Sequence, residues 1–181
     1  MIFSKTDIEG LVVIDTKKYA DERGYFFESY QHQKFSEFIG KDIKFVQENE
    51  SLSALNVIRG LHFQKPPFAQ GKLVRVSYGK VIDIVLDIRS NSTTYGQPFS
   101  IELSQENGKQ LWIPEGFAHG FVCLEANSLL NYKCTNYYNQ ASEDAIAWYS
   151  SVLDINWGVE NPIVSDKDQI AKDFSTFVSP F

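Results

Sequence analysis

Short runs of alternating apolar and polar residues recur along this chain, and they constrain its fold more than any other feature. Residues 72–89, KLVRVSYGKVIDIVLDIR, hold two such runs joined at Gly79, with four aliphatic side chains from Ile82 to Ile88 on one face. Similar runs are GLVVID, GYFFESY, KFVQENES, NVIRGLHF, FSIEL, QLWIP, GFVCL and SLLNYKCTNYY. They lie roughly 8 to 12 residues apart and are separated by turn residues, a pattern typical of an all-β sandwich or barrel.

Helical periodicity is scarce. QKFSEFIG places Phe35, Phe38 and Ile39 at helical spacing before Gly40, which predicts one short helix, and SDKDQIAKDF predicts a second near the end. No internal repeat, low-complexity tract or linker interrupts the chain, so we expect a single domain over residues 1–181. A dozen short strands with two small helices indicate an all-β jelly roll.

Charge and the N-terminal stretch restrict the class of partner and the compartment. The net charge of −6 disfavours nucleic acid as a partner, although two or three cations in a pocket could still hold a nucleotide. Lys5, Asp7 and Glu9 interrupt the N-terminal stretch, and no apolar run is long enough for a signal peptide or a membrane span. We therefore expect a cytoplasmic protein in which Cys123 and Cys134 are free buried thiols.

The stretch RGLHFQKPPFAQGKLV, residues 59–74, carries more polar groups than a buried strand normally does. It could be a solvated edge, a metal site or a pocket for a charged small molecule. Strict alternation places Arg59 and His62 on opposite faces of a strand. Both can reach one cavity only if the chain bulges between them, which Gly60 permits; otherwise Arg59 faces water. Lys72 shares parity with inward-facing valines, so its cation needs a partner.

The other two histidines differ in their surroundings. His32 lies in the polar run SYQHQK and is expected at the surface. His119 lies among glycines and aromatic residues in IPEGFAHGF, where it can be either a hydrogen-bonded core histidine or a functional one. PEGFAH matches one half of the cupin metal motif, but the region corresponding to the other half reads GLHFQK, with one histidine and no carboxylate in register. We therefore expect no metal cofactor.

Asp168 has two possible roles. Ser165 and Asp168 stand in S-x-x-D order, so the carboxylate can cap the last helix. Alternatively, it can hold His62 in one tautomer, as the third group of a triad does.

Two further strands offer polar rows. In SLLNYKCTNYY, Tyr132 and Tyr138 share parity, so we expect both on one face of a strand, one to supply a proton and the other to stack on a base. FVQENES likewise sends Gln47, Asn49 and Ser51 to one side, an amide row suited to hydrogen bonding.

Taken together, seven stretches of the chain resemble the dTDP-4-dehydrorhamnose 3,5-epimerase family. They are DERGYFFESY, FVQENESLS, IRGLHFQKPPFAQGKLV, LWIPEGFAHGF, YKCTNYY, SEDAIAWY and SDKD, and they occur in the order of that family. The resemblance implies a cupin-like jelly roll that needs no cofactor, acts on a dTDP-sugar and forms a homodimer. It also implies proton exchange beside the C4 ketone, with His62 as base, Asp168 as its partner, Tyr132 as acid and Lys72 near the ketone oxygen.

The resemblance further implies a set of substrate contacts. These are Arg23, Glu28, Gln47, Glu48, Asn49, Arg59, Lys72, His119, Glu143 and Lys167, with Tyr138 at the position that stacks on thymine.

Three alternatives remain at this level. The chain could invert C3 alone or isomerise another ketosugar, it could be a non-catalytic sugar-nucleotide binding module, or it could be a metal-dependent oxygenase. The chemistry of epimerisation fits the residues well, because it requires a base on one face, an acid on the other, and a cation where the enolate charge appears.

Overall fold

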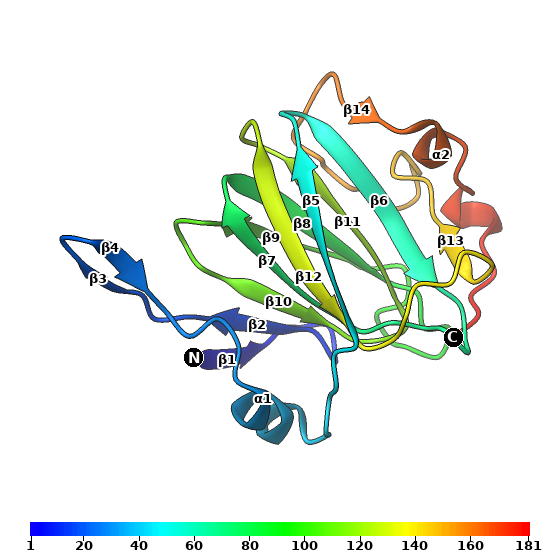
Figure 1. The fold of residues 1–181 in the computed structure, drawn as a ribbon. Coiled ribbons are helices and arrows are strands. Elements are labelled where there is room, and N and C mark those ends of the chain that lie inside the picture. The colour runs from blue at the N-terminus through cyan, green and yellow to red at the C-terminus, as the bar shows by residue number, and fades with distance from the viewer.

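Two facing β-sheets form the centre of the computed structural model, which describes residues 1–181 (Figure 1). The first sheet has the order β1-β2-β10-β7-β12-β5. Its strands are β1 (Ile2–Lys5), β2 (Val12–Asp15), β10 (Gln110–Ile113), β7 (Lys72–Tyr78), β12 (Ser128–Cys134) and β5 (Gln47–Ser53).

The second sheet has the order β13-β6-β11-β8-β9, and β14 pairs with β6. Its strands are β13 (Glu143–Ala145), β6 (Val57–Gln64), β11 (Phe117–Cys123), β8 (Lys80–Asp87), β9 (Pro98–Ser104) and β14 (Ile163–Val164). A separate hairpin of β3 (Tyr19–Asp21) and β4 (Gly24–Phe26) extends away from both sheets (Figure 1). The all-β prediction is confirmed, and the two antiparallel sheets face each other as in a jelly roll.

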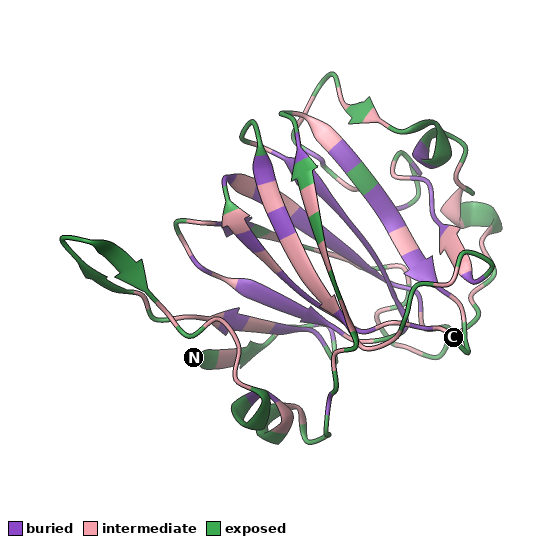
Figure 2. Ribbon diagram, viewed as in Figure 1, coloured by how far each residue is buried: buried purple, intermediate pink, exposed green.

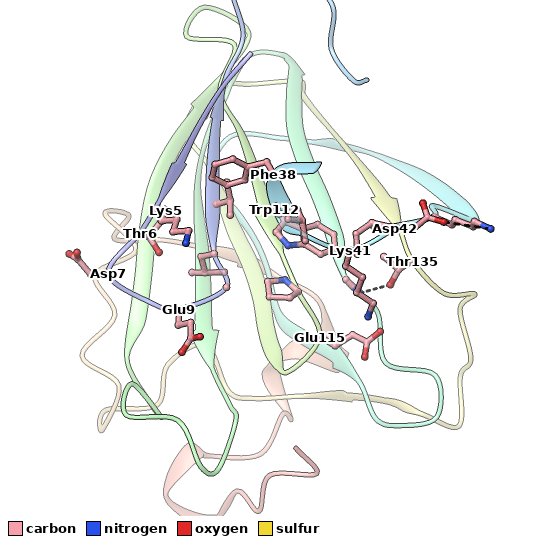
Figure 3. Close-up of a pocket in the computed structure, with 18 residues that line it drawn as sticks. Lys5, Thr6, Asp7, Glu9, Phe38, Lys41, Asp42, Trp112, Glu115 and Thr135 are labelled. Carbon is pink, nitrogen blue, oxygen red and sulfur yellow. Dashed lines mark hydrogen bonds and ion pairs between the residues drawn. The ribbon is translucent and has the colours of Figure 1, made fainter. Parts of the chain in front are cut away.

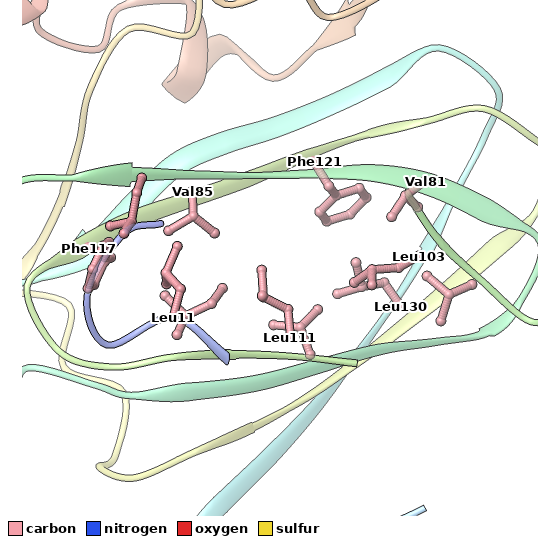
Figure 4. Packing of buried hydrophobic residues seen from close by; sticks show 12 residues of the cluster. Leu11, Val81, Val85, Leu103, Leu111, Phe117, Phe121 and Leu130 are labelled. Atoms are coloured by element: carbon pink, nitrogen blue, oxygen red, sulfur yellow. The ribbon is translucent and has the colours of Figure 1, made fainter. Parts of the chain in front are cut away.

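Strands β10 and β11 are buried throughout, whereas the β3–β4 hairpin is exposed along its length (Figure 2). Apolar side chains form three clusters, one between the sheets and two on their outer faces. The central cluster includes Val74 and Leu130 from the first sheet and Val85 and Phe121 from the second (Figure 4). A second cluster lies where the C-terminal segment covers the outer face of the second sheet. The third lies where the helix packs on the outer face of the first sheet. The space between the sheets is therefore walled on both sides by rigid strands.

The predicted first helix is confirmed as α1 (His32–Ile39). Phe35 is buried in the third cluster, and Gly40 ends the helix in the left-handed conformation that glycine adopts without strain, with φ of 76°. No helix in the structure is long and apolar enough to cross a membrane.

The second predicted helix is much shorter than expected. Only α2 (Asp166–Gln169) is helical, and a 3₁₀ turn, η1 (Phe174–Thr176), follows it. Ile170 is 84% exposed, so no apolar face continues the helix, and Lys172 instead pairs with Ile146 beside the sheet. Pairing with the sheet replaced the expected helical turns.

Strand β12 is also shorter than predicted. Its neighbours β5 and β7 begin at Gln47 and Lys72, both opposite Cys134, so strand pairing stops there apart from one backbone bond from Thr135 to Gly71. Tyr138 consequently lies in a loop, and its expected place on the strand beside Tyr132 is wrong. Cys123 and Cys134 are free and buried, as predicted.

A β-bulge interrupts β6 at the expected glycine. His62 pairs with His119, but Arg59 pairs with Phe121, so Gly60 and Leu61 together oppose one residue of β11. Gly60 has φ of 132°, and a Cβ atom there would lie 2.5 Å from the Cα atom of Gly120. Only glycine fits this close approach. The bulge therefore places Arg59 and His62 on the same face of β6. This confirms the prediction that the two side chains can reach one cavity only if the chain bulges at Gly60.

Candidate active site

The first sheet presents a polar row to the space between the sheets. Cys134 pairs with Gln47 on one side and Lys72 on the other, and Tyr132 pairs with Asn49 and the buried Val74. Because Val74 belongs to the central cluster, the side chains in register with it face the interior. The inward direction predicted for Lys72, Gln47 and Asn49 is therefore confirmed.

The second sheet presents a base to the same space. His62 lies on β6 opposite the first sheet, and its imidazole approaches Asp168, with 2.5 Å between Nε2 and Oδ1. The histidine side chain is 29% exposed and the carboxylate only 3%, so the ring has one nitrogen held by a buried acceptor and one free to meet a ligand. This is the arrangement of a general base oriented by a carboxylate.

The charge state of Asp168 suits this role. Burial opposes ionisation of the carboxyl, but His62, the Gly60 N–H and Ser165 outweigh it, so the pKa of Asp168 lies below its ordinary value. The Ser165 hydroxyl caps the N–H of Asp168, whereas the Asp168 carboxylate points to His62. Of the two roles considered for Asp168, the geometry supports the orientation of His62.

A second histidine–aspartate pair lies behind the first. His119 and Asp83 are both buried, with 2.8 Å between Nε2 and Oδ2, and His119 is the direct neighbour of His62 across the sheet. His119 is thus a hydrogen-bonded interior histidine beside the candidate base. The sequence analysis did not identify Asp83; the available signal was an aspartate in the middle of a strand that is apolar on both faces.

Lys72 carries a cation into this enclosed space. Burial lowers the pKa of Lys72, and the neighbouring ionisable groups, the thiol of Cys134 and the carboxylates of Asp83 and Glu143, oppose that effect. The ammonium forms no ion pair; its Nζ lies 5.7 Å from the centre of the Tyr132 ring. The partner that this cation needs in the substrate-free protein is therefore the aromatic face of Tyr132, with more distant carboxylates, and not a contacting carboxylate.

Tyr132 lies on the wall opposite His62. Burial raises the pKa of its phenol, so the hydroxyl stays protonated. A neutral phenol on the wall opposite a base can donate a proton to the far side of a bound ring.

Tyr138 reaches the rim of the cavity through a loop. Its N–H donates to Gln47 Oε1 and its hydroxyl donates to Glu143 Oε2, both over 2.9 Å. Glu143 also forms an ion pair with Lys167. Burial opposes ionisation of Glu143, but Lys167 and Tyr138 prevail and place its pKa below the ordinary value. The ring of Tyr138 is 54% exposed, so one of its faces can accept a ligand.

Arg59 lies further along β6 and spans the gap to β5. Its guanidinium donates to the Ser53 hydroxyl over 3.2 Å and to the Leu52 carbonyl over 3.3 Å. Neither acceptor is charged, so the cation remains available to an anion.

Three of the predicted contacts are not brought to this cavity within the chain. Glu48 points to the outer face of β5, where it pairs with Lys133 at 2.7 Å. Glu28 pairs with Lys34 of α1 at 2.9 Å. Arg23 lies at the tip of the β3–β4 hairpin, 84% exposed and paired with Asp21, at the end of the molecule remote from β6 (Figure 1).

A wide cleft lies elsewhere in the structure. It has a volume of about 990 Å³ and lies between the N-terminal loop, α1 and Trp112 (Figure 3). Three lysines and four carboxylates line it, and it contains no histidine, so it has no oriented base. We therefore assign the chemistry to the space containing His62 and not to this cleft.

Comparison with known proteins gives a consistent result. The family model described as dTDP-4-dehydrorhamnose 3,5-epimerase matches residues 5–176. The dTDP-4-dehydrorhamnose 3,5-epimerase of Salmonella typhimurium is 50% identical over 172 residues, covering 94% of each chain.

Two solved structures agree with this match. The crystal structure of dTDP-4-dehydrorhamnose 3,5-epimerase from Elizabethkingia anophelis NUHP1 has a TM-score of 0.92 at 44% identity and covers 97% of both chains. That of dTDP-6-deoxy-D-glucose-3,5-epimerase from Legionella pneumophila Philadelphia 1, in complex with dTDP-4-keto-L-rhamnose, has a TM-score of 0.93 at 43% identity. It covers 98% of this chain and 94% of that one.

Proposed function

The chain belongs to the dTDP-4-dehydrorhamnose 3,5-epimerase family, and we propose that the residues gathered between its two sheets carry out that family's reaction. The reaction is epimerisation at C3 and C5 of dTDP-4-dehydro-6-deoxy-D-glucose, which gives dTDP-4-dehydro-L-rhamnose in dTDP-rhamnose biosynthesis. The observation that carries the residue assignment is the His62–Asp168 pair on one wall of the cavity, with Lys72 and Tyr132 on the other.

Each step of the reaction has a group placed for it. The ring nitrogen of His62 that is not bonded to Asp168 removes the proton beside the C4 ketone, and the resulting enolate charge develops on the ketone oxygen. Lys72 stabilises that charge in a space where burial strengthens electrostatic interactions. Tyr132 then returns a proton to the opposite face of the carbon, which inverts it.

The nucleotide lies toward the rim in this proposal. Arg59 is placed to meet the diphosphate because its present acceptors are neutral. Tyr138 offers an exposed ring on which thymine can stack, and the Glu143–Lys167 pair fixes that ring through its hydroxyl. Gln47 and Asn49 supply amides for sugar hydroxyl groups.

We further propose that the enzyme is a homodimer in which the β3–β4 hairpin reaches the partner's cavity. A lone two-stranded hairpin is marginal in water, and this one exposes Tyr19, Tyr25 and Phe26. Arg23 at its tip cannot reach His62 of its own chain, so a second copy would give that cation a substrate anion to bind.

Mixing inactive chains tests the shared site. Arg23→Ala and His62→Ala chains, unfolded and refolded together, would form dimers with one intact cavity, and about one quarter of the normal activity should return. No recovery from demonstrably mixed dimers would refute the contribution of the hairpin. We place the enzyme in the cytoplasm, a location that two free buried thiols support.

Incubation of the purified protein with dTDP-4-dehydro-6-deoxy-D-glucose in D₂O tests the reaction itself. We expect deuterium at both C3 and C5, and reduction of the product to dTDP-L-rhamnose by the reductase of the pathway. Deuterium at C3 alone would identify a C3 epimerase, and binding without exchange a sugar-nucleotide binding module. Activity that tracks metal content would support a metal-dependent enzyme; independence of metal stays a prediction.

A further inference from the structure

Asp83 occupies a position that stability alone does not explain. It lies in the middle of β8 between Val81 and Val85 of the central cluster, and none of its surface is exposed. One carboxylate oxygen accepts from His119, but the other, Oδ1, is buried without any hydrogen-bond partner. Leaving a buried carboxylate oxygen unpaired is costly, and an apolar residue of similar size would be more favourable at this site.

The charged groups around Asp83 identify what its charge acts on. Lys72 shares the inward parity of Val74 on β7, and Asp83 shares that of Val81 and Val85 on β8, so both side chains point from opposite sheets into the space between them. The negative charge of Asp83 favours the protonated amine of Lys72. The other groups that face Lys72 already have roles: Glu143 of β13 is paired with Lys167, and burial raises the pKa of the Cys134 thiol of β12, which keeps it neutral.

The remaining titratable groups of the cavity are also engaged. His62 of β6 is bonded to Asp168, Arg59 of β6 donates to neutral acceptors on β5, and Tyr132 of β12 presents its ring to Lys72. Asp83 is therefore the fully buried carboxylate that has spare bonding capacity and acts on Lys72.

We propose that Asp83 is a positioning residue for the epimerisation: one oxygen orients His119, and the charge of the carboxylate holds Lys72 as an ammonium opposite the base. This inference rests on the proposed function for the meaning of Lys72, but the coupling between the two side chains is a property of the free protein. Replacing Asp83 removes a negative charge beside a buried cation and so favours the neutral amine.

Titration of the lysines in the substrate-free protein tests the coupling directly. In protein labelled with ¹³C-lysine, the Cε signal of Lys72 is assigned by its absence from Lys72→Arg. We expect Asp83→Asn to lower the midpoint of the Lys72 titration by about one pH unit or more. His119→Asn is the matched control, because it removes the hydrogen bond to Asp83 but keeps the charge, and should not lower the midpoint. An unchanged midpoint in Asp83→Asn, or an equal fall in both variants, would overturn the proposal.

The pH dependence of turnover provides the second test. The alkaline decline of kcat should begin at lower pH in Asp83→Asn by a similar interval, and it should not move in the Lys72→Arg background, where the cation stays charged. A loss of the same size at every pH would show a purely structural role and contradict the proposal. Asp83→Ser serves the same comparisons if the asparagine variant does not fold. Absence of deuterium exchange in the wild-type protein would refute the proposed function while leaving the lysine titration informative.

Discussion

Strand β8 carries two buried aspartates, Asp83 and Asp87, which differ in how fully they are bonded. Both face the same side of the strand and neither has any exposed surface. Arg89 donates two side-chain bonds to Asp87, at 2.9 and 2.7 Å, and its backbone N–H donates a third at 3.0 Å. The hydroxyl groups of Ser92 and Thr94 add bonds of 2.6 and 2.7 Å. Asp83 has one bond in total.

The comparison separates a structural charge from a functional one. Burial opposes ionisation of Asp87, but the bonds from Arg89, Ser92 and Thr94 prevail and lower its pKa to about 2. Those bonds fix the corner between β8 and the following loop. Asp83 lacks such compensation; it bonds to His119 alone and points into the space between the sheets, as Lys72 does. Replacing Asp87, which is fully hydrogen-bonded, should therefore affect stability. Replacing the groups of the cavity around Asp83 should affect turnover.

The largest effect on turnover is expected from replacing the candidate base in the cavity. His62→Ala removes the positioned base and should lower turnover by about 10² to 10⁴-fold, with deuterium exchange reduced in parallel. Exchange into substrate, followed by NMR, measures this directly. His32→Ala is the matched control, because that histidine is an exposed surface residue paired with Asp42 and should leave exchange intact. Near-normal exchange in His62→Ala would exclude it as the base.

Removal of the Lys72 cation should follow closely. Lys72→Met keeps most of the stem and should raise the barrier by about 2.7 to 4 kcal/mol, as for loss of an oxyanion stabiliser. Single-turnover rates and calorimetric binding of dTDP separate chemistry from affinity, and affinity should change far less. Lys80→Met is the matched control, because Lys80 of β8 pairs with Glu102 and Glu125 and has no role in the proposed reaction. A Lys72→Met enzyme that fails only through weaker nucleotide binding would contradict the enolate role.

Asp87→Asn should lower the stability of the fold and leave turnover unchanged. The difference between the ordinary pKa of 3.8 and about 2 corresponds to roughly 2.5 kcal/mol in the free energy of unfolding near neutral pH. For a chain of this size, Tm should fall by roughly 5 to 10 °C, measured by calorimetry. Activity per folded molecule should be retained. A turnover defect larger than the loss of folded protein would break the proposed separation.

The depressed pKa of Asp87 also predicts that part of the stability of the fold is lost at acid pH. Because the folded pKa of Asp87 is depressed, its contribution to stability is complete above about pH 4 and is lost as the pH falls toward about 2. Urea unfolding of wild type and Asp87→Asn across this interval should therefore converge. Curves that stay parallel down to the lowest pH would assign the stabilisation to packing instead of charge.

The smallest expected effect is at the rim. Tyr138→Ala should weaken dTDP binding by about 1 to 3 kcal/mol through lost stacking, measured by calorimetry. Tyr132→Phe should leave binding nearly unchanged and alter the ratio of products, because only the proton donor is removed. Equal binding losses in the two variants would show that the tyrosines do not divide these roles.

Alternation along strands was sufficient to predict most of the walls of the cavity. The inward row of Gln47, Asn49 and Lys72 followed from parity. The bulge at Gly60 followed because Arg59 and His62 can face one cavity only if the strand bulges between them. These inferences are local, because each depends on residues within one strand.

What the sequence could not supply depends on long-range pairing. Asp168 meets His62 across 106 residues, and the local S-x-x-D pattern favoured helix capping equally well. The end of β12 was set by where its neighbours begin, which placed Tyr138 in a loop. Asp83 was missed because the prediction used only the aliphatic face of β8 that contains Ile82 and Ile84, and Asp83 lies on the opposite face. The positions of Arg23 and Glu48 depend on sheet topology that no single stretch encodes.

The bulge in β6 also has a consequence for comparing relatives by alignment. A single inserted residue changes the phase of the strand, so that residues before Gly60 and residues after Leu61 follow opposite parity. A relative with a one-residue gap here would keep the fold and its apolar pattern on one half of the strand, yet turn either its arginine or its histidine out of the cavity. Gap placement at this one column therefore offers a criterion for separating catalytic members of the fold from those that have lost the reaction.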